Sequence, residues 1–256
     1  MSTKTPQPDI FAQWLCMQTK DVRHHKLVLL SERDGLREKV LDELRRIVRS
    51  HYVAPATTAK RLTELGAPKT AELLKDHLPT EKKARSGELG EVLATELAER
   101  RLGFKVPIRR LQWKDGRNMA LRGDDIVAVA KASGAPIKFL KGESKSRASL
   151  AQSVVDEAAE ALDRDRGRPT RHSVLLVADR LRQQGQDALA RELEDALLQS
   201  FRSTPVEHLL FTVSGNNPET MLNDHLTACR KRRVRHAVGM HIKDHGAFVK
   251  NLYSKL

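Results

Sequence analysis

The sequence predicts an α/β or α+β fold in which helices flank a mixed central sheet, with a mostly helical extension over residues 1–80. Two observations predict it. Short apolar runs alternate with longer stretches that carry apolar residues at helical spacing, and glycine and proline clusters separate them. The length of 256 residues fits one large domain, or a catalytic domain over residues 81–256 preceded by the extension.

The extension shows helical spacing in two places. Apolar residues recur every four positions within Gly35–Ser50, which predicts one amphipathic helix. Leucines lie on both sides of Gly66–Pro68 within residues 57–77, as expected for two helices joined by a turn. A short apolar segment, Lys26–Leu30, is a candidate strand, and the extension is a candidate surface for binding a partner.

The helix expected next covers Ser86–Leu102. Leucine and valine form a stripe along it, Ser86 can cap its start, and Gly103 can end it. The following segment, Phe104–Trp113, alternates loosely and is expected to be a strand, with a turn over residues 114–118.

A β-hairpin is predicted beyond this turn. Asp125–Ala130 and Ile137–Lys145 are strand-like segments on either side of a turn cluster at residues 131–136. A helix over Ser149–Leu162 is expected to follow, because apolar residues lie on one of its faces.

The last third of the chain continues the alternation. Ser173–Ala178 is a continuous apolar run, which predicts a buried central strand. Leu181–Phe201 has the spacing of a long amphipathic helix. Strands are expected at Val206–Val213 and Val234–Ile242, and a closing helix at Asp244–Tyr253.

The charge balance restricts the class of partner. The formal net charge is +13, which favours nucleic acid, an anionic membrane or an acidic protein. Aromatic residues make up only 4% of the chain, so base-stacking platforms are disfavoured and contact with a phosphate backbone is favoured. No apolar run is long enough to span a bilayer, and no helix has the aromatic anchors of a membrane-surface helix.

The cysteine and N-terminal patterns indicate a cytoplasmic protein. Two cysteines far apart in the sequence provide neither a disulfide framework nor a zinc motif, and cytosolic thiols stay reduced. The first residues contain no apolar segment of the kind that signal peptides have.

Three residues of the predicted hairpin carry the candidate chemistry. Glu143 and Lys145 project to one face because strand side chains alternate, and Asp125 on the adjacent strand can add a second carboxylate. Together with a backbone carbonyl such as that of Ser144, they would suit Mg²⁺ or Mn²⁺. Lys145 could orient a water molecule and neutralise a phosphate. Taken alone, the Glu143–Lys145 pair would also fit an ion pair on a solvated strand face.

The order of these features resembles the PD-(D/E)XK nuclease superfamily over residues 86–180. A helix with a glutamate, a strand with Asp125, a hairpin, a Glu-x-Lys strand and a second helix follow one another as in that superfamily. The resemblance implies a restriction-endonuclease-like fold and metal-dependent hydrolysis of DNA. Asp124 stands where the superfamily pattern has proline, which leaves Asp124 as an alternative to Asp125.

A closer resemblance is to HamA, the nuclease subunit of Hachiman antiphage defence systems. Ser86–Glu91, Arg122–Asp125 and Gly142–Ser146 resemble that family. The resemblance implies a DNA-cleaving effector controlled by a superfamily 2-type helicase, HamB, with which it would form a heterodimer. The alternative hypothesis is a non-catalytic DNA-binding or regulatory subunit of a helicase complex.

A third carboxylate could come from the helix that begins near residue 86. Glu88 and Glu91 are three residues apart and therefore share a face, although either could simply be a favourable charge in a first helical turn. A related Gly-x-x-Gly-Glu pattern fits Gly87, Gly90 and Glu91, and favours Glu91. Gln152 matches a glutamine found in some branches of the superfamily, but it would equally fit an exposed helix position.

Two basic stretches are candidates for DNA contacts. The first surrounds the candidate site in sequence, and its main candidates are Arg109, Arg110, Lys114, Arg117 and Arg122. A solvated basic surface would account for the same residues. The second stretch is Arg230–Arg233 together with Arg235, and contacts with DNA, with a partner or with solvent all remain open for it.

Overall fold

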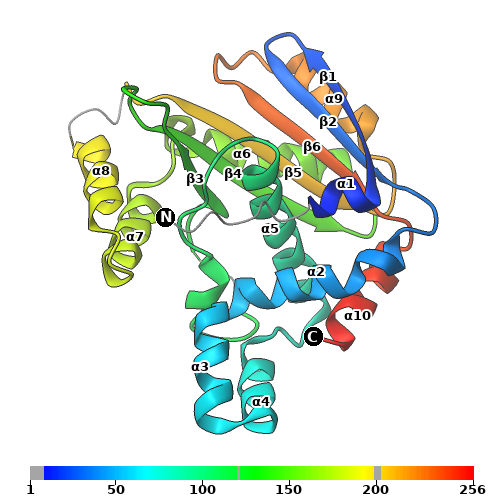
Figure 1. The fold of residues 1–256 in the computed structure, drawn as a ribbon. Helices are drawn as coiled ribbons and strands as arrows, with labels where there is room; N and C mark the ends of the chain where they lie inside the picture. Colours follow the sequence, from blue (N-terminus) through cyan, green and yellow to red (C-terminus); the bar gives the residue numbers. More distant parts are fainter. Residues whose placement is uncertain (1–8, 120–121, 199–202) are drawn as a thin grey trace.

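The computed structural model describes residues 9–119, 122–198 and 203–256, which form a sheet covered by helices on both faces (Figure 1). The strands of these residues are β1 (Leu15–Val22), β2 (His25–Glu32), β3 (Ile126–Ala130), β4 (Lys138–Arg147), β5 (Val206–Ser214) and β6 (Arg235–His241). Their order in the sheet is β1-β2-β6-β5-β4-β3, in which β2, β6, β5 and β4 are parallel and the edge strands are antiparallel to their neighbours. The predicted mixed α/β sheet is therefore confirmed.

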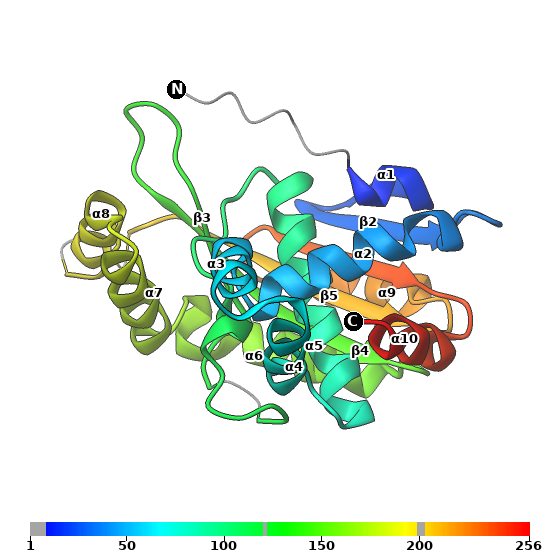
Figure 2. The ribbon, with the colours of Figure 1, turned by 60° about the horizontal axis from the view of Figure 1, so that its bottom comes forward.

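The helices divide between the two faces of the sheet (Figures 1 and 2). The first face carries α1 (Ile10–Trp14), α2 (Arg37–Tyr52), α5 (Lys82–Arg100) and α10 (His245–Ser254). The other face carries α6 (Gln152–Gly167) and α9 (Glu219–Ala228), with α7 (Arg171–Gln183) and α8 (Asp187–Leu198) beside the β3 edge. The short 3-10 helix η1 (Arg110–Trp113) lies in the connection between α5 and β3.

The strand β3 shows why the hairpin segment is apolar throughout. Ile126 and Ala128 belong to the core cluster under α5, whereas Val127 and Val129 belong to the cluster under α7 and α8. Because both of its faces are buried, the strand has no polar side to reveal its period.

The helical hairpin of α3 (Pro55–Leu65) and α4 (Ala67–His77) extends away from the sheet (Figure 1). Gly66 lies between the two helices with a φ of 78°, a conformation that favours glycine. The turn predicted within residues 57–77 is thus confirmed. Strands β1 and β2 also fall within the first 80 residues, and β2 pairs with β6. A domain boundary near residue 80 stays a prediction.

Ser173–Ala178 was expected to be a central strand, and this prediction is wrong because the segment lies in α7. Thr170 caps this helix, since its hydroxyl accepts a hydrogen bond from the backbone N–H of Ser173 at 3.0 Å. Val174 and Leu181 are buried on the same helical face. In a short, continuous apolar run, the spacing of apolar residues cannot distinguish a strand from a buried helix. The helical conformation of this segment therefore depends on its tertiary packing.

Two further element predictions need correction. Phe104–Trp113 contains only an isolated bridge between Lys105 and Val129, followed by η1, and Pro107 has no N–H to donate to a ladder. The helix expected over Leu181–Phe201 is divided at Gly185. Residues 199–201 of that prediction lie outside the described residues.

The start of α5 also differs from the expectation. This helix begins at Lys82, one turn before Ser86, and Ser86 does not cap it. Instead, the Ser86 hydroxyl lies 2.9 Å from the hydroxyl of Ser146 on β4. Across the described residues, no helix has the length and apolarity that crossing a membrane would require.

Gly90 sets the distance between α5 and β4. A β-carbon on Gly90 would lie 3.3 Å from the β-carbon of Ser146 and 3.5 Å from the hydroxyl oxygen of Ser144. A β-carbon on Gly87, one turn earlier in the same helix, would meet nothing within 4 Å. The close approach at Gly90 brings the carboxylates of α5 toward the end of the β3–β4 hairpin.

Gly90→Val is therefore expected to lower the free energy of unfolding by about 1–3 kcal/mol, because the branched side chain would push α5 away from β4. The matched control is Gly87→Ala, which is expected to raise it by up to about 1 kcal/mol through helix propensity. Urea denaturation measures both values. Equal stability of the two variants would contradict this packing.

Candidate active site

The centre of the candidate site is the point where strand β3 ends and β4 continues. The last pair of the antiparallel ladder at this end is Ile126 with Gly142. Asp125 precedes that pair, and its carboxylate accepts a hydrogen bond of 2.9 Å from the backbone N–H of Ser144. In a strand, the N–H and C=O of one residue point toward the same neighbour, so the Ser144 carbonyl faces the same side as Asp125. Asp125 and Glu143 are thus held at one fork of the sheet.

The two carboxylates at the fork are largely withdrawn from solvent. The side chain of Glu143 is 17% exposed and that of Asp125 is 25% exposed. Burial and the neighbouring charge of Asp125 raise the pKa of Glu143 to about 7. Burial also raises the pKa of Asp125, against the opposing effects of the Ser144 hydrogen bond and of Arg110. Two such carboxylates favour a compensating cation between or beside them.

Lys145 supplies a cation beside this pair. Its ammonium lies 3.1 Å from the carboxylate of Glu143 and 2.8 Å from that of Glu157 on α6. Although burial disfavours the charged form, the hydrogen bonds to Glu157 and Glu143 raise the pKa of Lys145. Lys145 is therefore a stable positive charge rather than a proton acceptor. Glu157 was not predicted, because nothing in its spacing distinguishes it from the other acids of that helix.

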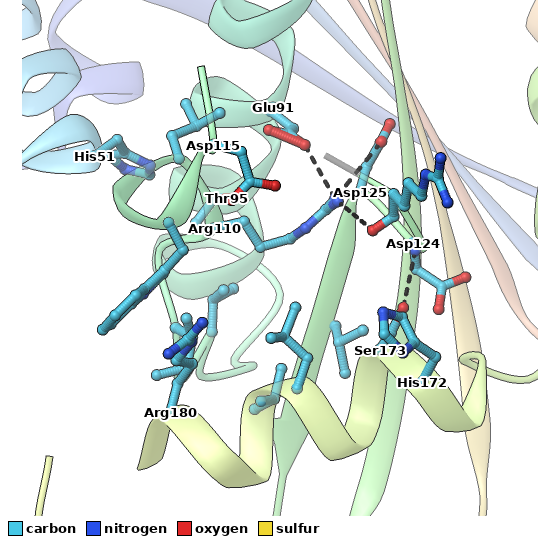
Figure 3. Close-up of a pocket in the computed structure, with 18 of the residues that line it drawn as sticks. His51, Glu91, Thr95, Arg110, Asp115, Asp124, Asp125, His172, Ser173 and Arg180 are labelled. Atoms are coloured by element: carbon cyan, nitrogen blue, oxygen red, sulfur yellow. Dashed lines mark hydrogen bonds and ion pairs between the residues drawn. The ribbon is translucent and has the colours of Figure 1, made fainter. Parts of the chain in front are cut away.

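Glu91 joins the site from α5 through Arg110. The guanidinium of Arg110 lies 3.1 Å from the carboxylate of Glu91 and 3.8 Å from that of Asp125 (Figure 3). Burial raises the pKa of Glu91 to about 8, although Arg110 opposes this shift. Sequence reasoning proposed Arg110 for DNA contact and missed this double ion pair, since the loop that carries it has no regular period.

Glu88 occupies a neighbouring but separate cluster. Its carboxylate forms an ion pair with Lys114 and accepts a hydrogen bond of 2.7 Å from the hydroxyl of Tyr52. Of the two helix glutamates, Glu91 pairs with Arg110, which also lies near Asp125, whereas Glu88 pairs with Lys114. A catalytic role for either glutamate stays a prediction.

Asp124, the alternative to Asp125, is held away from the fork. Its carboxylate accepts a hydrogen bond of 2.7 Å from the backbone N–H of Thr170 and lies 3.4 Å from the ammonium of Lys141. Its own backbone N–H donates to the hydroxyl of Ser173 (Figure 3). Asp124 therefore anchors the start of α7, and Asp125 is the acid that faces Glu91 and Ser144.

A cavity of about 280 Å³ opens beside these groups, between α5, η1, β3 and α7 (Figure 3). Glu91, Arg110 and Asp125 form part of its wall. Apolar side chains such as Ile108, Trp113 and Val127 line much of the rest. Glu91 and Asp125 thus border a sheltered space, in keeping with the effect of burial on their pKa values, whereas Glu143 and Lys145 are not among its lining residues.

Several basic residues predicted to contact DNA are engaged within the protein. Arg109 forms an ion pair of 2.5 Å with Glu99, and Lys114 pairs with Glu88. The guanidinium of Arg117 donates to backbone carbonyls of the segment that precedes α5. These pairs reduce the positive charge that the first basic stretch can offer to a ligand.

The remaining two predicted DNA contacts lie at the surface. Arg122 is exposed at the rim of the cavity, and its backbone carbonyl accepts a hydrogen bond of 3.1 Å from Arg110. Gln152 is the exposed first residue of α6 and donates to Asp156 at 2.9 Å. A role of these residues in DNA binding stays a prediction.

The donor groups at the fork fit a divalent cation in their chemistry. Asp125, Glu143 and the Ser144 carbonyl are hard oxygen donors, which Mg²⁺ and Mn²⁺ prefer. Burial raises the pKa of both carboxyl groups, and a cation bound beside them would favour their charged forms. Among the described residues, no three His, Cys, Asp or Glu side chains already form a metal-binding group, so water or substrate oxygens would complete the coordination.

Fold and site together define a mixed α/β protein with a carboxylate–lysine centre at a forked edge hairpin. Comparison with known proteins identifies the family: the HamA family model matches residues 9–256, and the chain belongs to the HamA family. It is 26% identical over 176 residues to the Hachiman protein HamA of Bacillus cereus. That alignment covers 68% of this chain and 62% of the relative, so less than two thirds of the relative's length is spanned. The resemblance to HamA is confirmed.

The pKa values predict how stability depends on pH. The folded-state pKa of Glu143 lies above its ordinary value. Its contribution to the free energy of unfolding is therefore fully present below about pH 4.5, and it is lost as the pH rises through about 7. In EDTA, Glu143→Gln is therefore expected to be more stable than the wild type near pH 8, on the order of 1 kcal/mol, with little difference near pH 5. Thermal unfolding across this range measures the difference.

Glu157→Gln is the control with the opposite sign. Its hydrogen bond with Lys145 lowers the pKa of Glu157, so its contribution is present above the ordinary glutamate pKa and is lost on acidification. This variant is expected to be no more stable than the wild type at neutral pH. If both variants shift in the same direction near pH 8, the electrostatic description of the fork is wrong.

Proposed function

We propose that this protein is a metal-dependent deoxyribonuclease, a cytoplasmic effector of a Hachiman antiphage defence system that hydrolyses DNA phosphodiester bonds. The observation that carries the proposal is the fork, where Asp125 is bonded to the backbone of Ser144, Lys145 pairs with Glu143, and the charge of Asp125 acts on Glu143. Membership of the HamA family supports it, and so does the net charge of +13, which favours a polyanionic substrate.

In this proposal, each residue at the fork has a defined task. Asp125, Glu143 and the Ser144 carbonyl would hold Mg²⁺ or Mn²⁺. The bound cation would lower the pKa of a water molecule and stabilise charge on the phosphate. Lys145, which stays protonated, would donate a hydrogen bond to the attacking water or to a phosphate oxygen. Glu91, which is not among these ligands and has a pKa of about 8, could accept or release a proton near neutral pH.

The proposal includes control by a partner protein. The relative of this chain is named as a Hachiman protein, and a superfamily 2-type helicase, HamB, is the partner that the family resemblance implies. We propose that the two proteins form a heterodimer in which the helicase delivers DNA to the fork. The alternative is a non-catalytic subunit. Buried carboxylates of raised pKa lower the free energy of unfolding at neutral pH, and a non-catalytic subunit would have no need for two of them beside a lysine.

The direct test is degradation of linear duplex DNA by the full chain together with its helicase, in Mg²⁺ and in EDTA. Glu143→Gln and Lys145→Ala are each expected to reduce cleavage on the order of a hundredfold or more, because each removes a group at the reacting phosphate. Glu219→Gln, which changes an exposed carboxylate on α9, is the matched control and is expected to cleave like the wild type. Equal cleavage by all four proteins would overturn the proposal.

Arg110 provides a test that does not depend on cleavage. Arg110 and a divalent cation would both be attracted to the carboxylate of Asp125, so Arg110→Gln is expected to tighten Mn²⁺ binding by on the order of tenfold. Titration of Mn²⁺ followed by electron paramagnetic resonance measures this affinity. Arg109→Gln is the matched control, because its guanidinium pairs with Glu99 instead. An unchanged affinity in Arg110→Gln would contradict a cation site at these carboxylates.

A further inference from the structure

The second basic stretch meets another basic segment in the folded chain. The backbone of α6 leaves the helical conformation at Arg164, and the segment from Arg164 to Arg168 is called the loop after α6 below. A β-carbon on Gly167 would lie only 2.8 Å from the guanidinium of Arg233, so this loop lies directly against the turn before β6. Asp163 at the end of α6 connects the same two segments, because it pairs with Arg235 at 2.8 Å and with Lys231 at 3.7 Å. Two arginine-rich segments about 65 residues apart in sequence thus form one surface.

The backbone of the loop after α6 adopts a rarely used conformation. Asp165 and Arg166 have φ values of 56° and 59°, which L-residues other than glycine seldom adopt, and Gly167 follows at 70°. This turn leaves the side chains of Arg164 and Arg166 exposed. Strained backbone of this kind recurs where a protein holds side chains for a ligand.

Like charges are held close together on this surface. Burial and the nearby charge of Arg233 lower the pKa of the Arg168 guanidinium, which shows that the two cations are crowded. Arg230 and Arg232 add two exposed guanidinium groups on the adjoining turn. Asp163 and Asp165 are the acids of the loop, and Asp163 is engaged by Arg235. An anionic ligand would relieve the remaining repulsion.

The surface is continuous with the candidate active site. The ammonium of Lys141, two residues before Glu143 on β4, donates a hydrogen bond of 3.1 Å to the backbone carbonyl of Arg164. The charge of Arg164 also acts on the carboxyl groups of Glu143 and Glu157. Arg164 therefore stands between the fork and the rest of the basic surface.

We propose that this surface binds the phosphate backbone of duplex DNA and leads it to the fork. The residues that form it are Arg164, Arg166, Arg168, Arg230, Arg232 and Arg233. The inference rests on the proposed function, since it names the surface along which the substrate of that site lies. Duplex DNA fits because its phosphates repeat regularly along a line, whereas the described residues of these two segments include no Phe, Trp or Tyr side chain for stacking on single-stranded bases.

The test compares two variants of the full chain that each lose four positive charges. The first carries Gln in place of Arg164, Arg166, Arg230 and Arg232. The control carries Gln in place of Lys39, Lys69, Lys83 and Lys250, which are exposed on α2, α4, α5 and α10. Because both variants have the same net charge, any difference between them reports the position of the charge. Circular dichroism and thermal unfolding check that both variants fold.

Binding of a fluorescein-labelled duplex DNA is followed by anisotropy in EDTA, between about 50 and 200 mM NaCl. The first variant is expected to bind on the order of a hundredfold more weakly than the wild type at the lower salt concentrations. The slope of log affinity against log salt concentration is expected to be less negative by about 3 to 4, because each lost phosphate contact lowers the magnitude of this slope by about 0.9. The control is expected to resemble the wild type.

Equal weakening in the two variants, or none in the first, would overturn the inference. Selective loss of binding to vesicles of phosphatidylcholine and phosphatidylserine, with DNA binding unchanged, would also overturn it. The assay contains no divalent cation, so it is independent of hydrolysis. If Glu143→Gln still cleaves DNA while the arginine variant no longer binds it, the proposed function fails and the binding surface is supported. If Glu143→Gln does not cleave DNA while the arginine variant binds it like the wild type, only the binding surface is refuted.

Discussion

The hydrogen bond from the backbone N–H of Ser144 to the carboxylate of Asp125 is the interaction on which the site depends. Strand β4 extends beyond its last residue pair with β3 while it stays paired with β5, so its backbone donors that point to the β3 side have no strand partner there. Asp125 satisfies one of them with its side chain. The same bond fixes the carboxylate beside the backbone of Ser144, the residue after Glu143, and its charge acts on the Glu143 carboxyl group.

The surrounding elements add charge compensation to that pair. Lys145 lies on the same strand as Glu143, and Arg110 reaches Asp125 from the connection between α5 and β3. The close packing of α5 at Gly90 adds Glu91 to the same group of charges. Burial raises the carboxyl pKa values while the cations lower them, and the balance leaves Glu143 and Glu91 poised near neutral pH.

The sequence predicted the parts of this arrangement that have a regular period or an ordered motif. The hairpin strands and the placement of Asp125 beside the Glu-x-Lys strand follow from the alternation of strand side chains. The apolar run at Ser173–Ala178 was misassigned because its period is ambiguous. Partnerships such as that of Arg110 with Glu91 depend on how an irregular loop packs, and no local pattern encodes them.

The most direct measurement is a crystal structure of the full chain soaked with Mn²⁺, with an anomalous difference map. A peak is expected within bonding distance of the carboxylates of Asp125 and Glu143. A map whose ordered Mn²⁺ binds elsewhere, with these two carboxylates left without metal, would contradict a cation site at the fork.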